Sequence, residues 1–262
     1  MFIHGLLVGG DLWRNVVPEL GEGLRAITPD WPLGAHELAM HDDADLSIPR
    51  LARLIAESLE ALDLDDVVLV ANDTGGALTQ LVLTEHRERV GAAVLTSCDC
   101  YENFLPPLFK PLLATAHVPP VLRLVFELMR LRPLRRLPFA LGWLSKRAIP
   151  NEIVVGWVAR GVTDAGVRRD VAKVMRGISP RYTMEAARHF SEVEFPILLA
   201  WATEDRLFPL SDARKMEAAF HNARLETIDD AYTFVSEDQP LRVAQLVREF
   251  ALNQSQTSAD VA

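Results

Sequence analysis

The chain reads Val67-Val68-Leu69-Val70-Ala71-Asn72-Asp73-Thr74-Gly75-Gly76-Ala77 at the point that decides its fold. The β-branched apolar run predicts a buried strand, and the apolar pattern over 76–86 predicts a helix. Between them, Asp73 has a small residue two positions before it and another two positions after it. This spacing is typical of a nucleophile elbow, where the chain turns so sharply that only small side chains fit around the reactive residue. Asp73 occupies the reactive position.

Strand and helix patterns alternate on both sides of this stretch. Such alternation predicts an α/β fold with a mostly parallel central sheet, flanked by the helices that cross between its strands. The predicted strands are 2–3, 24–28, 67–70, 91–96, 197–201 and 225–228, and the predicted helices are 11–20, 47–62, 76–86, 210–220 and 240–252.

The alternation stops between residues 101 and 193, where only helical patterns punctuated by prolines occur. We therefore predict an α/β core made of 1–100 and 194–252, interrupted by an all-helical insertion over 101–193. The insertion is locally basic, which we interpret as a solvated surface in preference to an anion-binding one. The polar tail over 253–262 is expected to be disordered.

Composition excludes several classes of protein. The 262 residues fit one large α/β domain, and the net charge of −9 argues against a nucleic-acid partner. No run of about 18 apolar residues occurs, so we expect no membrane span and no membrane partner. Cys98 and Cys100 lie two positions apart on an extended strand, where their Cα atoms are near the upper distance limit for a disulfide and their Cβ vectors run parallel, which favours reduced thiols and a cytoplasmic location.

Four short motifs follow four of the predicted strands. They are His4-Gly5-Leu6, Pro29-Asp30-Trp31-Pro32, the Asp73 elbow and Thr203-Glu204-Asp205. Their order and spacing resemble the α/β-hydrolase superfamily over essentially the whole chain, and the helical insertion resembles its cap domain. An Asp at the elbow is similar to the haloalkane dehalogenase and epoxide hydrolase branch. The resemblance also implies two strands before the first one, and we expect either that these are absent here or that the start of the chain was assigned too late.

The resemblance assigns roles residue by residue. It implies that Asp73 is the nucleophile and that the backbone N–H groups of Leu6 and Thr74 form the oxyanion hole. Asp205 matches the acid of the catalytic triad, and Asp99 is a second candidate for that acid. Such a carboxylate attacks an sp³ carbon to form an alkyl ester, which a water activated by His then hydrolyses.

The sequence departs from this pattern near its end, where it reads Asp230-Ala231-Tyr232-Thr233-Phe234. Thr233 stands where the resemblance implies the catalytic His, and Tyr232 replaces a glycine. A general base normally contributes ~10²- to 10⁴-fold to the rate. Thr74 also replaces the Trp that usually follows the nucleophile in this branch, which lowers the expectation of dehalogenation.

Two classes of function therefore stay open. The first is hydrolysis of a C–halogen, epoxide or ester-like bond in a small, largely apolar substrate, with His36 as a candidate replacement base. The second is a non-hydrolytic lyase, isomerase or cyclase, or a ligand-binding protein. Tyr232 and Thr233 are expected to border the substrate in either case. No residue spacing fits a metal site, and no cofactor is expected. The exposed sheet edge leaves self-association open.

Overall fold

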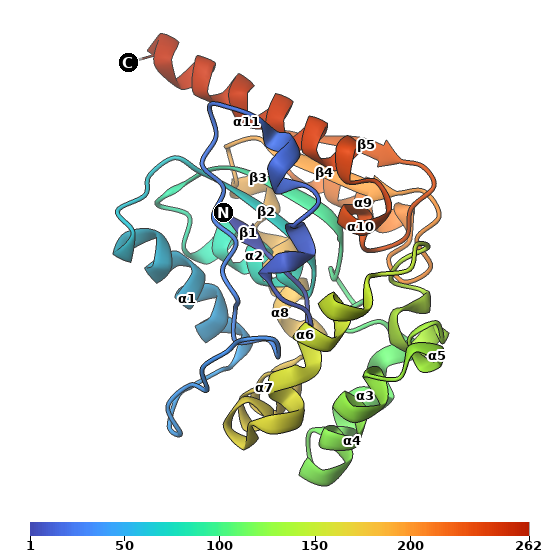
Figure 1. Cartoon of the computed structure of the whole chain (residues 1–262). Helices are drawn as coiled ribbons and strands as arrows, with labels where there is room; N and C mark the ends of the chain where they lie inside the picture. Colours follow the sequence, from blue (N-terminus) through green and yellow to red (C-terminus); the bar gives the residue numbers. More distant parts are fainter. Residues whose placement is uncertain (262) are drawn as a thin grey trace.

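Five parallel strands form the central sheet of the computed structural model, which describes residues 1–261 (Figure 1). They lie side by side in chain order, as β1 (Phe2–Ile3), β2 (Val67–Asp73), β3 (Val90–Cys98), β4 (Ile197–Ala202) and β5 (Ala223–Ile228). Every neighbouring pair is parallel. The carboxyl ends of all five strands therefore meet at one edge of the sheet, and the loops that leave them lie together there.

Each face of the sheet carries its own hydrophobic core, because side chains alternate between the two faces along a strand. Leu69 and Ala71 contribute to one core and Val70 to the other. The first core is completed by α1 (Ile48–Ala61), α2 (Thr74–Glu85), α8 (Pro180–Arg188) and α9 (Leu210–Ala219). The second is completed by the short 3₁₀ helices η1 (Gly10–Trp13) and η2 (Val17–Leu20) with α10 (Val235–Asp238) and α11 (Pro240–Val261).

Two predicted elements near the start of the chain are wrong in detail. Residues 24–28 form no regular strand, although the Ile27 carbonyl accepts a hydrogen bond of 2.8 Å from the Phe2 amide. Strand β1 pairs with β2 on one side but has only two residues, so it offers little backbone for a second strand on its other side. The helix predicted over 11–20 is replaced by η1 and η2, because Pro18 has no N–H to continue a helix through this segment.

Only helical elements occur among the described residues between β3 and β4. Proline opens most of them, which suits its fixed φ and missing N–H at the first helical turn. They are η3 (Pro107–Phe109), α3 (Lys110–Thr115), α4 (Pro119–Met129), α5 (Arg132–Arg135), η4 (Pro138–Gly142), α6 (Asn151–Thr163), α7 (Ala165–Gly177), α8 and η5 (Phe190–Glu192). Helix α4 packs on α6 and α7, whereas α8 packs on α2 beside the sheet.

Helix α11 is long and includes residues 253–261, where the sequence predicted disorder. Residue 262 lies outside the described residues, and so do the side chains from 255 onward. Within the described part of the chain, no helix combines the length and apolar character needed to cross a membrane.

Candidate active site

The elbow is built by strand β2 running directly into helix α2. Asp73 has φ 54° and ψ −130°, a left-handed conformation that is unusual for a residue other than glycine. The two glycines behind it allow α2 to lie against its neighbours. A Cβ on Gly75 would sit 2.5 Å from the Ile3 carbonyl oxygen, and one on Gly76 would sit 2.3 Å from the Cβ of Cys98. Small residues are therefore required to hold Asp73 at this edge of the sheet.

The Asp73 carboxyl group is almost fully buried, with 7% of the residue exposed. Burial raises its pKa to about 7, and the nearby charge of Asp205 acts in the same direction. Hydrogen bonds from the backbone N–H groups of Thr74 and Leu6 oppose this rise by stabilising the ionised form. Both predicted oxyanion-hole donors therefore contact Asp73. Gly5 keeps the approach open, because a Cβ there would lie 2.2 Å from Asp73 Oδ2.

Asp99 lies behind the elbow, just after β3, and is fully buried. Its Oδ2 accepts a hydrogen bond of 3.1 Å from Thr74 Oγ1, and its Oδ1 has no partner among the described residues. Burial and the neighbouring charge of Asp73 raise the pKa of Asp99 well above its ordinary value. A negative charge on Asp73 therefore disfavours a second negative charge on Asp99.

Asp205 and Thr233 are joined by a hydrogen bond, and the charge of Asp205 is close enough to act on Asp73. Asp205 Oδ1 accepts hydrogen bonds from the Leu207 amide at 2.8 Å, the Phe208 amide at 2.9 Å and the Thr233 hydroxyl at 3.0 Å. Burial raises the pKa of Asp205, while these donors and the Ser97 hydroxyl lower it. The position expected for the catalytic His thus keeps its contact with the acid, but through a hydroxyl group.

Asn72 connects the elbow to the loop that carries Thr233. Its Nδ2 donates to the Thr233 carbonyl at 2.8 Å, to Thr96 Oγ1 at 3.0 Å and to the Ser97 carbonyl at 3.2 Å. Asn72 is fully buried, so these bonds have no water to replace them. The sequence analysis assigned it no role, although its place beside Asp73 was a usable signal.

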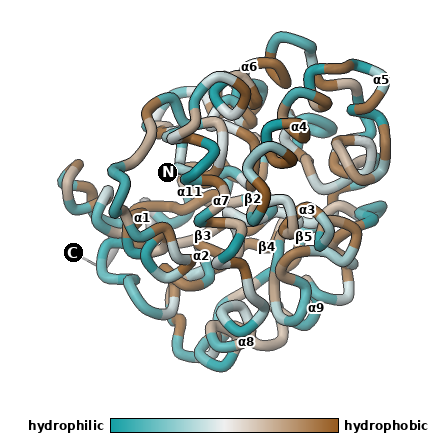
Figure 2. Tube along the Cα trace, turned by 90° about the horizontal axis from the view of Figure 1, so that it is seen from below, coloured by the Kyte–Doolittle hydropathy of each residue, from teal (hydrophilic) through white to brown (hydrophobic). Residues whose placement is uncertain are grey.

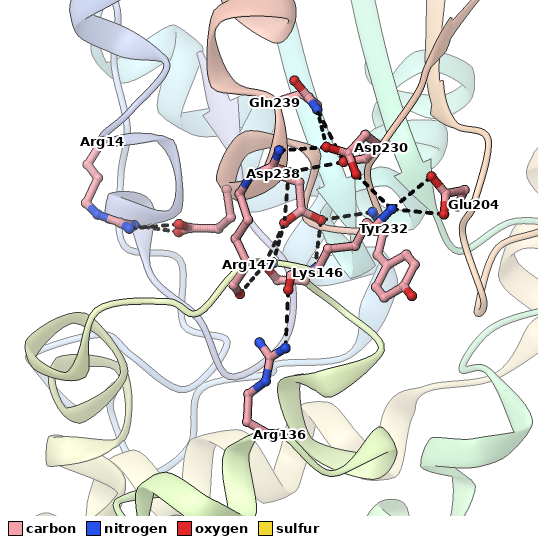
Figure 3. Close-up of polar contacts among 11 residues, drawn as sticks. Arg14, Arg136, Lys146, Arg147, Glu204, Asp230, Tyr232, Asp238 and Gln239 are labelled. Carbon is pink, nitrogen blue, oxygen red and sulfur yellow. Dashed lines mark hydrogen bonds and ion pairs between the residues drawn. The ribbon is translucent and has the colours of Figure 1, made fainter.

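Asp238 holds the same loop from the other side (Figure 3). Its carboxylate accepts four bonds of 2.9 Å, from the Tyr232 amide, the Ser145 hydroxyl and the amides of Lys146 and Arg147. One side chain thereby ties the loop after β5 to the insertion. Sequence reasoning assigned Asp238 no role, because its partners in the insertion lie more than 90 positions away along the chain.

Of the predicted site residues, Asp73 and Leu6 line the cavity that contains Asp73, whereas Thr74, Asp99, Asp205 and Thr233 lie behind its lining and His36 and Tyr232 lie elsewhere. His36 Nε2 lies 3.4 Å from Asp170 Oδ2, and its Nδ1 accepts from the Gly34 amide at 3.3 Å. Burial lowers the pKa of His36, and it does not line the cavity that contains Asp73. The ring of Tyr232 lies under the Arg206 guanidinium, 4.7 Å from its centre, and also lies outside the lining of the cavity. No group of three or more metal-ligating residues occurs in the described part of the chain.

A largely apolar cavity lies over Asp73, between the sheet edge and the insertion. Asp73 is the only ionisable side chain in its lining. Trp157 lines it too, but its indole N–H donates to Asp11. The lining residues are Leu6, Leu7, Val8, Asp73, Leu105, Phe109, Leu112, Val125, Phe126, Met129, Phe139, Ala140, Leu141, Leu144, Val154, Trp157 and Val158.

A comparison of the chain with known protein families agrees with the fold and the elbow described above. The model of the alpha/beta hydrolase family matches residues 1–246. The chain belongs to this family. Its expected fold is thereby confirmed, and the relatives described next confirm that it resembles dehalogenases within this family.

Curated relatives with different reactions resemble this alpha/beta hydrolase at similar levels. Haloalkane dehalogenase 2 of Mycobacterium tuberculosis (strain ATCC 25618 / H37Rv) is 25% identical over 258 residues, covering 95% of this chain and 86% of the relative. The 2-hydroxy-6-oxo-6-phenylhexa-2,4-dienoate hydrolase of Burkholderia cepacia is 25% identical, covering 86% and 77%. The two relatives thus leave the substrate class open.

Solved structures support the same alpha/beta hydrolase fold. Haloalkane dehalogenase DbeA from Bradyrhizobium elkani USDA94 superposes with a TM-score of 0.77 at 15% identity, covering 98% of this chain and 90% of that one. An alpha/beta hydrolase fold protein from Burkholderia ambifaria gives 0.77 at 19% identity, covering 94% and 88%. At these identities the likeness concerns the fold alone.

Proposed function

We propose that this alpha/beta hydrolase cleaves a C–halogen, epoxide or ester-like bond in a small, largely apolar substrate, with Asp73 as the nucleophile. The observation that carries the proposal is the placement of one carboxyl group, Asp73, in an otherwise apolar cavity, held by the backbone N–H groups of Leu6 and Thr74. An apolar lining favours an uncharged substrate, and the buried carboxylate gains nucleophilicity from its lack of solvation.

The first step follows from this arrangement. An ionised Asp73 oxygen attacks the electrophilic carbon while the bond to halide or epoxide oxygen breaks with its electron pair, which leaves an alkyl ester and a free halide or an alkoxide that takes up a proton from solvent. With an ester-like substrate, the same oxygen attacks the carbonyl carbon, the alkoxide leaves and takes up a proton, and an acyl anhydride forms on Asp73. Leu6 and Thr74 then hold the ester carbonyl oxygen and stabilise the negative charge that develops on it during hydrolysis.

The second step requires a base that removes a proton from water. Asp205 is the best placed carboxylate, because it lies near Asp73 and already accepts the Thr233 hydroxyl. A water held by Thr233 loses its proton to Asp205, its oxygen adds to the ester carbonyl, and the departing alkoxide takes up the proton. This base is weaker than imidazole near neutral pH, so we expect slow release of the ester.

A specific observation favours a second candidate function. Thr233 provides a hydroxyl where a hydrolytic site needs imidazole, and no His lines the cavity among the described residues. A carboxyl group with a pKa of about 7 is well suited to proton transfer. The alternative is therefore a non-hydrolytic lyase, isomerase or cyclase, or a ligand-binding protein, in which Asp73 exchanges a proton or a hydrogen bond with the ligand.

The test is incubation of the protein with a panel of 1-haloalkanes, terminal epoxides and p-nitrophenyl esters, recording intact mass and product together. A mass increase on Asp73, located by peptide mapping, followed by product release supports the proposal. Asp73→Asn is the control and is expected to lose both signals, with activity reduced by about 10⁴-fold or more. Neither adduct nor product with any substrate class would favour the second candidate.

A further inference from the structure

One end of the insertion exposes an unusual amount of apolar surface. Val121, Leu124, Leu128, Leu131 and Phe139 are 42%, 52%, 40%, 52% and 62% exposed. The first three recur at helical spacing along one side of α4, and the others follow it in chain order. We call these five residues the α4 face. Figure 1 places α4 and α5 at the end of the molecule opposite α11, and Figure 2 shows hydrophobic and hydrophilic segments alternating around them.

Positive charge surrounds this apolar surface. Residues 110–147 contain eight Lys and Arg and one Glu, although the whole chain has a net charge of −9. Arg123, Arg130, Arg132 and Arg136 are exposed. Glu127 is the acid within reach of Arg123 and Arg130, at 3.8 Å and 3.5 Å. Exposed apolar side chains set among cations are typical of a surface that lies in a membrane interface.

The α4 face is also continuous with the cavity over Asp73. Val125 and Met129 line the cavity from one side of α4, while Leu124 and Leu128 are exposed on another. Phe139 belongs to both, because it lines the cavity and is mostly exposed. An apolar compound dissolved in a lipid layer in contact with this face would be next to the cavity.

We propose that the α4 face docks on the surface of an anionic lipid bilayer. The arginines around the face complement phosphate-bearing headgroups, and the five apolar side chains enter the acyl boundary. A second copy of the chain fits less well, because a twofold contact would bring the same arginines against one another. The earlier expectation of no membrane partner rested on the lack of a spanning segment, and docking of this kind needs none.

The test is vesicle flotation of the full chain with phosphatidylcholine vesicles, with and without about 30 mol% phosphatidylglycerol. We expect binding to the anionic vesicles that falls at least tenfold between low and 0.5 M salt, because screened arginines lose their attraction. The double variant Leu124→Asp/Leu128→Asp should reduce the bound fraction at least tenfold. Leu241→Asp is the matched control, since Leu241 is 66% exposed on α11, away from this face, and should bind as the parent protein does.

Three results would overturn the proposal. The first is that the protein does not bind anionic vesicles. The second is that the α4-face variant and the Leu241 control bind equally well. The third is that sedimentation shows the parent protein as a dimer and the α4-face variant as a monomer. Circular dichroism of each variant checks that it is folded. Asp73→Asn should bind vesicles like the parent, so failure of the docking proposal is distinguishable from failure of the proposed reaction.

Discussion

The elbow after β2 and the loop after β5 lie at the same edge of the sheet, yet they differ in how far they keep the hydrolase pattern. At the elbow, Asp73 has its strained turn, its small neighbours and both backbone donors. In the loop, Thr233 keeps the hydrogen bond to Asp205 but has no basic nitrogen. In the proposed reaction, the residues assigned to forming the covalent bond are therefore all in place, whereas the position assigned to breaking it has changed from His to Thr. The comparison teaches that family membership and catalytic completeness are separate properties.

The largest expected effect comes from restoring the base. Thr233→His should raise the rate of ester release by about 10²- to 10⁴-fold, because imidazole next to Asp205 can remove a proton from water at neutral pH. The measurement is single-turnover decay of the Asp73 adduct by mass spectrometry. Where the larger side chain does not fit, Thr233→Gly with added imidazole tests the same point. No acceleration in either experiment would show that the two halves do not form a hydrolytic site.

The second expected effect concerns stability at the elbow. The unfolded Asp73 carboxyl group ionises near pH 4 and the folded one at about 7. Folded Asp73 therefore holds its proton across this window, and the native state loses stability as the pH rises through it. Asp73→Asn removes this loss and should raise the free energy of unfolding by about 4 kcal/mol at about pH 8, with little change at about pH 4. Urea unfolding at both pH values measures the difference, and equal gains at both would contradict the assigned cause.

A third experiment weakens the connection between the two regions. Asn72→Ala leaves the Thr233 and Ser97 carbonyl groups without their buried donor, and it should destabilise the fold by about 2 kcal/mol. Thermal unfolding measures this loss, and Asn222→Ala on the surface is the matched control. A loss no larger than that of the control would mean that Asn72 does not connect the elbow to the loop.

The smallest expected effect isolates the remaining hydroxyl contact. Thr233→Val keeps the shape of the side chain but removes the hydrogen bond to Asp205, at a cost of about 1 kcal/mol. Thr203→Val removes a similar bond of 2.9 Å to Asp229 on the surface and should cost less. Chemical denaturation of both variants makes the comparison. If Thr233→Val releases the Asp73 adduct at the same rate as Thr203→Val and the parent protein, Thr233 does not hold the attacking water.

Local sequence patterns predicted most of the strands and helices of the α/β core and part of the candidate active site. Each predicted strand from β2 to β5 forms close to its expected position, because the apolar runs of β2, β3 and β4 and the alternating apolar and polar residues of β5 are local signals. The strand expected over 24–28 and the helix over 11–20 failed because their outcome depended on a partner strand of two residues and on a proline in mid-segment. His36 looked available as a base in the sequence, but Asp170, 134 positions away, holds it in a separate network.

The sequence by itself determined that Asp73 sits in an elbow, since the steric demand for small neighbours is visible in adjacent residues. It also determined that Thr233 stands where a His is expected. Only the tertiary structure decided that Asp73 is the one ionisable group in an apolar cavity and that Asp238 fastens the Thr233 loop to the insertion. Those features depend on contacts between segments more than 60 residues apart, such as Asp238 and Ser145 at 93 positions. Burial and pKa follow from such contacts, because they are set by what packs around a group and not by its neighbours in the chain.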